Sequence, residues 1–142
     1  MKILVLNGPN LNLLGQREPE LYGSLSLPEI EERLKTVGEE LGLEVECMQS
    51  NHEGELVDAI QNAGANGVGI ILNAGAYTHT SVALRDAVTG SQAVVVEAHL
   101  TNPHAREEFR HVSLLSGVCA GLVAGFGWES YLLALQWFLR QK

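Results

Sequence analysis

The sequence is poor in positive charge. Lys and Arg together number nine against 17 Asp and Glu, so the formal net charge is −8. Nucleic acids and anionic membrane surfaces both select basic patches, and this balance argues against either as a partner. An anionic small molecule would need cations that are concentrated locally.

Long apolar runs are also missing. The longest apolar-looking stretch, Gly117 to Gly127, is far shorter than the roughly 20 residues of a membrane span and is broken by glycines. The run from Ile3 to Leu6 is too short for a signal-peptide core, and a turn follows it at once. We therefore expect a cytoplasmic protein with no membrane partner.

Cysteines are scarce as well. Cys47 and Cys119 lie far apart in apolar stretches without a C-x-x-C spacing. We expect buried thiols, because neither a disulfide nor a metal-binding pair is indicated.

The remaining composition is that of an ordinary globular protein, with 46% hydrophobic and 18% charged residues in a chain of 142. A chain of this length falls within the usual range of one domain. We therefore expect a single domain over residues 1–142.

Short aliphatic runs alternate with stretches of helical periodicity. The runs predict strands over residues 2–7, 43–49, 68–72, 93–96 and 118–123. Helices are expected from the S-x-x-E capping box at Ser26 to Gly42, after a second S-x-x-E box at Ser50, and over residues 82–88 and 131–139. This alternation predicts an α/β fold: a flavodoxin-like, doubly wound, five-stranded parallel sheet in three α/β/α layers.

Polar residues follow three of the predicted strands, at 7–10, 73–80 and 99–110. Ligands of such sheets bind beyond the carboxyl ends of the strands, so these loops are expected to converge on one pocket. The long stretch from Gly8 to about Ser26 is typical of a lid or binding loop.

The first loop contains Arg17 and Tyr22. A nearby guanidinium stabilises a phenolate, so Tyr22 is a candidate general base. The alternative is structural: the Tyr22 ring packs against the loop, and Arg17 pairs with Glu18 or Glu20.

The second loop places Asn73 at a strand end and His79 near a helix start. The alternative is that Thr78 or Thr80 caps this helix while His79 is an exposed helical residue. No phosphate-binding glycine motif follows a strand, which argues against a nucleotide- or flavin-dependent reductase.

The third loop begins with Glu97 and His99, which alternation in a strand puts on one face. A carboxylate beside an imidazole supports the imidazolium, so His99 is a candidate general acid. The alternative is a metal site of two histidines and one carboxylate, for which the chain has enough donors in His79, Glu97, His99, His104 and His111. No His-x-His or H-E-x-x-H spacing occurs, and we expect no metal.

Arg106 and Arg110 follow at helical i, i+4 spacing and predict a carboxylate site at a helix start. They could equally be solvated charges, Arg106 with Glu107 and Arg110 with Glu108.

Four segments, NGPNLNLLGQREPELYG, LNAGAYTHTSVALRDA, EAHLTNPHAREEFR and GFGWESYLLAL, occur in this order along nearly the whole chain. Together they resemble the type II 3-dehydroquinate dehydratases. The resemblance implies a flavodoxin-like fold and an anti elimination of water from 3-dehydroquinate, through an enolate, to 3-dehydroshikimate. It implies no metal and no cofactor.

The resemblance also implies roles for single residues. Tyr22 would remove the proton beside the ketone, with Arg17 stabilising its phenolate, and Asn10 would hold the water that stabilises the enolate. His99, oriented by Glu97, would protonate the departing hydroxyl. Substrate would be bound by Asn73, His79, Arg110 and the backbone of Leu100 and Thr101, and by Asp86 of a neighbouring subunit in a homododecamer built of trimers. The role of Arg106 is left open.

Some positions of this sequence differ from the pattern of the type II 3-dehydroquinate dehydratases. Ala98 and Thr101 are conservative changes for backbone binding, and HVSLLSGVCAG (residues 111–121) is expected to be a structural strand that bears on packing and not on catalysis. The only lysines, Lys2, Lys35 and Lys142, lie outside the candidate loops, which argues against a Schiff-base route. The alternative from another class is a non-enzymatic module that binds a small anion.

Overall fold

The computed structural model describes residues 1–16 and 18–142 and shows a parallel sheet of five strands. The strands are β1 (Lys2–Asn7), β2 (Glu44–Gln49), β3 (Gly69–Asn73), β4 (Val95–His99) and β5 (Gly121–Ala124). Their order is β2-β1-β3-β4-β5, and every pairing is parallel. This is the flavodoxin-like order, so the predicted fold class is confirmed.

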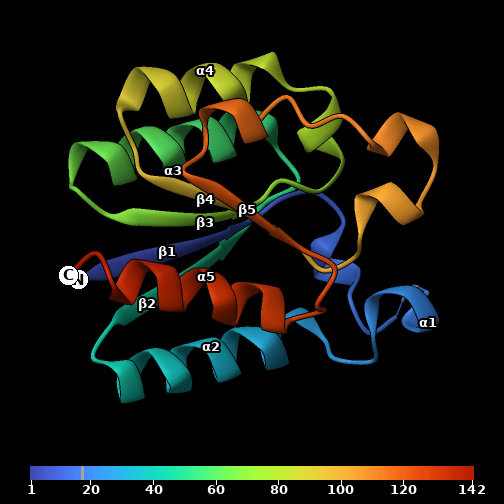
Figure 1. Cartoon of the computed structure of the whole chain (residues 1–142), viewed down its shortest axis with the longest axis horizontal. Coiled ribbons are helices and arrows are strands. Elements are labelled where there is room, and N and C mark those ends of the chain that lie inside the picture. The colour runs from blue at the N-terminus through green and yellow to red at the C-terminus, as the bar shows by residue number, and fades with distance from the viewer. Residues whose placement is uncertain (17) are drawn as a thin grey trace.

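Helices cover both faces of the sheet and make three layers (Figure 1). The long helices are α2 (Leu27–Leu41), α3 (Glu53–Ala65), α4 (Val82–Ser91) and α5 (Glu129–Leu139). Helices α3 and α4 lie on one face, and α2 and α5 on the other. The one-turn helix α1 (Pro19–Tyr22) lies in the loop after β1, beyond the carboxyl ends of the strands.

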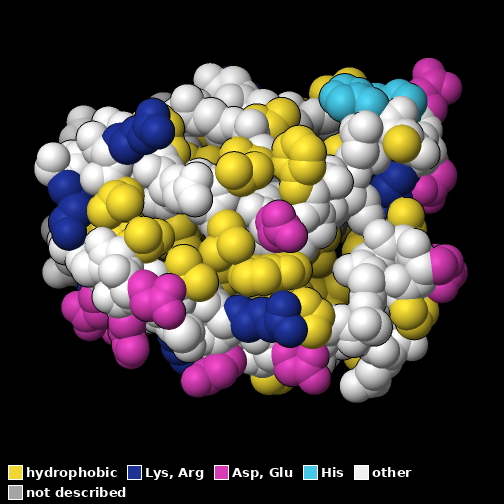
Figure 2. Space-filling model, turned by 60° about the horizontal axis from the view of Figure 1, so that its bottom comes forward, with side chains coloured by type: hydrophobic (Ala, Val, Ile, Leu, Met, Phe, Trp, Pro, Cys, Tyr) yellow, Lys and Arg dark blue, Asp and Glu magenta, His cyan; other side chains and the backbone are white. Residues whose placement is uncertain are grey.

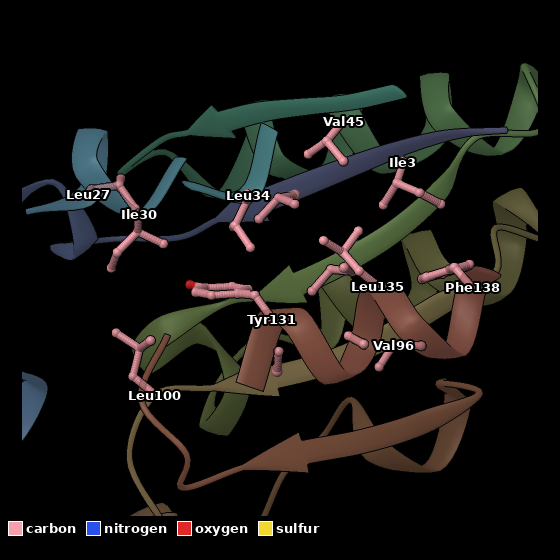
Figure 3. Close-up of a cluster of buried hydrophobic side chains, with 14 of the residues drawn as sticks. Ile3, Leu27, Ile30, Leu34, Val45, Val96, Leu100, Tyr131, Leu135 and Phe138 are labelled. Carbon is pink, nitrogen blue, oxygen red and sulfur yellow. The ribbon is translucent and has the colours of Figure 1, made fainter. Parts of the chain in front are cut away.

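A hydrophobic cluster fills the space between the sheet and each helical layer. On the α2 and α5 side, Tyr131 and Leu135 pack against Ile3 and Leu34 (Figure 3). On the other side, Leu56 and Ile60 of α3 and Leu84 of α4 pack on Leu6 and Ile70. All residues of β3 and four of the six in β1 are buried, on both faces of the sheet, which is why these strands read as aliphatic runs.

The start of α2 follows the predicted capping box. The Ser26 hydroxyl accepts from the Glu29 backbone N–H, and the Glu29 carboxylate accepts from the Ser26 N–H. Gly42 ends the helix in the left-handed region at φ 75°, where glycine carries no steric penalty.

The predicted capping box at Ser50 is wrong. Helix α3 begins at Glu53 with His52 at its N-cap position. The Ser50 hydroxyl instead donates to the Glu55 carboxylate and accepts from the His52 N–H. These bonds form a turn before the helix, so the helix begins two residues later than the pattern indicates.

Other predicted elements shift or disappear. Strands β4 and β5 begin two and three residues later than expected, and residues 111–120 form a loop with one 3₁₀ turn instead of a structural strand. The helix expected to carry Arg106 and Arg110 is replaced by two 3₁₀ turns, Pro103–Ala105 and Glu108–Arg110, because Arg106 between them has an extended backbone.

The face that carries α2 and α5 is partly apolar (Figure 2). Hydrophobic side chains gather near its centre, and acidic side chains lie along its lower edge. Leu133 and Trp137 of α5 are among the exposed large hydrophobic residues. No helix in the described part of the chain is long and apolar enough to cross a membrane.

Candidate active site

A cavity lies beyond the carboxyl ends of β1, β3 and β4. The loops that follow these three strands converge there, because parallel strands end at the same edge of the sheet: Asn7 is in register with Asn73. Most of the side chains singled out from the sequence line this cavity: Asn10, Tyr22, Asn73, His79, His99, Leu100, Thr101, Arg106 and Arg110. Pro9, Leu11, Leu14, Gly75, Ala76 and Pro103 complete the lining and were not predicted.

Tyr22 is the last residue of α1 and is half-buried at the cavity. The Arg106 guanidinium carbon lies 5.2 Å from the centre of the Tyr22 ring, within the range of a cation–π interaction. Arg17, which was predicted to act with Tyr22, lies outside the described residues. Arg106, whose role the sequence left open, is thus a cation in contact with the candidate base.

Asn10 is held in the left-handed region, with φ 68°. Its backbone N–H donates to the Asn51 Oδ1 at 3.0 Å, and Gln49 Nε2 donates to the same oxygen at 3.1 Å. Gln49 Nε2 also donates to the Gly8 carbonyl. The end of β2 therefore holds the first loop in place, which sequence reasoning missed because the partners are about forty residues apart.

Asn73 is almost fully buried at the end of β3. Its Nδ2 donates to the Tyr131 hydroxyl at 3.0 Å, and its Oδ1 accepts from the Gly75 N–H at 3.2 Å. The Tyr131 hydroxyl in turn donates to Asn7 Oδ1 at 2.5 Å. Burial raises the pKa of Tyr131, so this hydroxyl keeps its proton and its role as donor. Asn73 is thereby oriented, with one amide hydrogen left for a ligand.

His99 and Glu97 form a buried pair at the end of β4. His99 Nε2 lies 2.5 Å from Glu97 Oε2, and the two residues are 8% and 0% exposed. Burial alone would raise the pKa of Glu97, but hydrogen bonds from His99, Ser116 and Ser113 outweigh it and leave that pKa lowered. The carboxylate is therefore ionised at neutral pH, which supports a positive charge on His99.

Residues 111–121, which were expected to bear only on packing, also contact a candidate site residue. Ser113 and Ser116 both donate to the Glu97 carboxylate, at 3.0 Å and 2.5 Å. Neither serine was predicted, because they lie 16 and 19 residues from Glu97 in a loop without a motif of its own.

His79 ends a 3₁₀ turn over Gly75–His79, and Ser81, not Thr78 or Thr80, caps the helix that follows. His79 Nδ1 lies 2.8 Å from the Val112 carbonyl oxygen. Because a carbonyl only accepts, Nδ1 carries the proton, and Nε2 is left to interact with a ligand.

Arg106 and Arg110 both line the cavity, although the helix that was to align them is absent. Glu107 accepts from Arg110 Nε at 3.1 Å and lies 3.8 Å from Arg106 Nε, so Arg110 pairs with Glu107 and not with Glu108. The two guanidinium groups give an otherwise acidic molecule a local site for an anion.

Two predicted residues lie outside this cavity. Glu97 is behind His99, and Asp86 is exposed on α4. Within residues 1–16 and 18–142, no group of three or more His, Cys, Asp or Glu side chains is arranged to hold a metal ion.

Comparison of the sequence with known protein families agrees with the geometry of this cavity. The family model of dehydroquinase class II matches residues 1–139. The chain belongs to this family. The membership that the four segments indicated is thus confirmed.

Curated relatives of the family are similar over most of their length. The 3-dehydroquinate dehydratase of Rhizobium johnstonii is 56% identical over 133 residues, which are 94% of this chain and 92% of the relative. That of Prochlorococcus marinus is 56% identical over 136 residues, 96% of this chain and 94% of the relative.

A solved structure has nearly the same fold. The type II dehydroquinase of Butyrivibrio crossotus superposes with a TM-score of 0.95 at 45% identity, covering 99% of this chain and 97% of that one.

Proposed function

We propose that this protein is an enzyme that removes water from 3-dehydroquinate to give 3-dehydroshikimate, a step of the shikimate pathway. One observation carries the proposal: a candidate base, Tyr22, and a carboxylate-supported histidine, His99, line the same cavity. The relatives that bear the name 3-dehydroquinate dehydratase support the choice of substrate.

The reaction begins with loss of the proton beside the ketone. The Tyr22 phenolate accepts this proton, and the electron pair of the broken C–H bond moves into the carbonyl to give an enolate. Arg106, which contacts the Tyr22 ring, and Arg17 stabilise the phenolate. Asn10 holds a water that donates to the enolate oxygen.

The second step expels the hydroxyl group. The enolate collapses to form the C=C bond, the C–O bond breaks, and the His99 imidazolium gives its proton to the departing oxygen, so that water leaves. We propose an anti elimination, with Tyr22 and His99 acting on opposite faces of the ring. Tyr22 and His99 then return to their starting protonation through solvent.

Polar groups around the cavity bind the remaining oxygens of the substrate. Asn73, His79 and Arg110 bind oxygens of the substrate, and the backbone of Leu100 and Thr101 binds its carboxylate. The proposed reaction needs a base, an acid and oriented dipoles, and these side chains supply them without a cofactor or metal.

We further propose a homododecamer built of trimers, in which Asp86 reaches the cavity of a neighbouring subunit. Asp86 is exposed on α4, as such a role requires. The edge strand β5 and the loop before it expose large hydrophobic side chains, which favours a covering partner: Phe109 is 66%, Val112 68% and Leu122 50% exposed.

The two free thiols suit the reducing cytoplasm, where we place the enzyme.

Turnover of 3-dehydroquinate tests the proposal. The purified protein is mixed with the substrate in the presence of a chelator, and the absorbance of the conjugated enone product is followed. We expect turnover that survives the chelator and falls by at least about 100-fold in Tyr22→Phe, since a general base contributes that much.

Tyr77→Phe is the matched control. The Tyr77 hydroxyl donates to the Asn51 carbonyl outside the cavity, so this variant should keep most of its activity. If folded wild-type protein binds the substrate without turnover, the protein is instead an anion-binding module on the same fold.

A further inference from the structure

The Glu97 carboxylate is surrounded by hydrogen-bond donors. Oε2 accepts from His99 Nε2 at 2.5 Å and from the Ser113 hydroxyl at 3.0 Å. Oε1 accepts from the Ser116 hydroxyl at 2.5 Å and from Ser113 at 3.1 Å. Because Glu97 is fully buried, these three side chains replace the water that a carboxylate would otherwise bind.

The direction of the Ser113 hydrogen bond is set by the backbone. Ser113 Oγ accepts from the N–H groups of Leu115 and Ser116, both at 3.1 Å. A hydroxyl has two lone pairs and one proton, so both lone pairs are in use and the proton points at Glu97. Ser113 therefore acts only as a donor toward this carboxylate.

This arrangement suits an ionised Glu97 and one tautomer of His99. All three side chains can donate to the carboxylate and Ser113 can only donate, in agreement with the lowered pKa of Glu97. Glu97 is thus an ionised acceptor, the proton of the pair is on His99 Nε2, and Nδ1 is the ring nitrogen left to exchange a proton in the cavity.

We propose that Ser113 and Ser116 are positioning residues for the general acid: they hold Glu97 ionised and fixed, and through it they hold His99 in the tautomer and orientation that elimination needs. The inference rests on the proposed function. Neither serine lines the cavity that holds Tyr22 and His99. Both line a neighbouring cavity together with Glu97 and His99, and both hydroxyls are bonded to Glu97, so we assign them a role through this carboxylate.

Ser116→Ala is the cleaner test. Among described residues the Ser116 hydroxyl bonds Glu97 alone, whereas Ser113 also accepts from two backbone N–H groups that shape its loop. We expect kcat to fall by about 10-fold to 100-fold with KM little changed, the range seen for residues that orient a metal-binding histidine. Ser116→Thr, which keeps a hydroxyl, should recover most of the activity.

A second measurement does not depend on turnover. The ¹³C shift of the Glu97 carboxyl, followed against pH, should show titration at higher pH in Ser116→Ala, because one bond that stabilises the carboxylate is removed. At a pH where the His99 ring has lost one proton, its ¹⁵N shifts should report the remaining proton on Nε2 in the wild type and a mixture of tautomers in the variant.

Ser91→Ala is the matched control, since Ser91 is a half-buried serine at the end of α4 whose hydroxyl bonds only its own helix end within the described chain. Equal kcat and an unshifted Glu97 titration in Ser116→Ala would overturn the inference. A fall in kcat that Ser91→Ala shares, or that Ser116→Thr fails to recover, would also overturn it. If wild-type protein showed no turnover at all, the proposed function would fail, and the NMR titrations would still decide the role of the serines.

Discussion

Glu97 is a buried charge whose ionisation is tied to folding. Its pKa is lowered in the folded protein, despite burial, by bonds that the unfolded chain lacks. Its carboxylate therefore stabilises the fold at pH values above the ordinary pKa of a carboxyl group. This stabilisation is lost as the pH falls through the lowered pKa of Glu97.

We expect Glu97→Gln to be less stable than the wild type at neutral pH by about 1–3 kcal/mol, the cost of unsatisfied buried partners. The difference in the free energy of unfolding should become smaller as the pH is lowered, because the wild type then loses the contribution of the carboxylate and the variant has none to lose. Urea unfolding of both proteins at several pH values measures this difference. A difference that stays constant in acid would contradict the lowered pKa of Glu97.

Tyr131 connects the core to the site through two asparagines. Removing its hydroxyl in Tyr131→Phe leaves Asn7 Oδ1 and Asn73 Nδ2 without this partner inside the protein. We expect a loss of about 1–3 kcal/mol in the free energy of unfolding, measured by urea. Tyr77→Phe is the control, since its hydroxyl bond is exposed, and a loss as large as that of Tyr131→Phe would argue against the buried network.

At the scale of elements, α3 contains two glycines in different surroundings. A Cβ added to Gly64 would lie 2.6 Å from the Ser91 carbonyl oxygen of α4, so the two helices approach closely there. A Cβ on Gly54, in the first turn of α3, would meet no atom within 4 Å in the described chain.

We expect Gly54→Ala to raise the free energy of unfolding by about 0.5–1 kcal/mol, because alanine loses less backbone entropy in a helix. Gly64→Ala should lower it, since α4 must move to make room. Thermal unfolding of both variants tests the pair, and equal shifts of the same sign would contradict the packing of α3 on α4.

The elements also show what sequence reasoning reaches. The aliphatic strands, the capping box at Ser26 and the convergence of three loops follow from local patterns and from the rules of parallel sheets. The same S-x-x-E pattern at Ser50 failed, because whether a serine caps a helix depends on competing partners such as Glu55. The contacts of Ser113 and Ser116 could not be predicted from the sequence, because only folding brings their loop within hydrogen-bond distance of Glu97.

At the scale of the whole molecule, the assembly is the prediction with most consequence for the site. The cavity described for one chain holds the candidate base and acid, whereas Asp86 points to a neighbour's cavity only if subunits pack against α4. Hydrophobic side chains next to β5 are exposed on a single chain and would be covered in a trimer.

We therefore expect a mass in solution of about twelve times the 15.4 kDa of one chain, measured by sedimentation. Leu122→Glu should break the assembly, because it places charge on an exposed apolar edge strand that a partner would bury. Activity should fall together with the mass in this variant, whereas Asp86→Ala should lose activity at full mass. A wild-type chain that is monomeric and fully active would separate catalysis from assembly and remove the role proposed for Asp86.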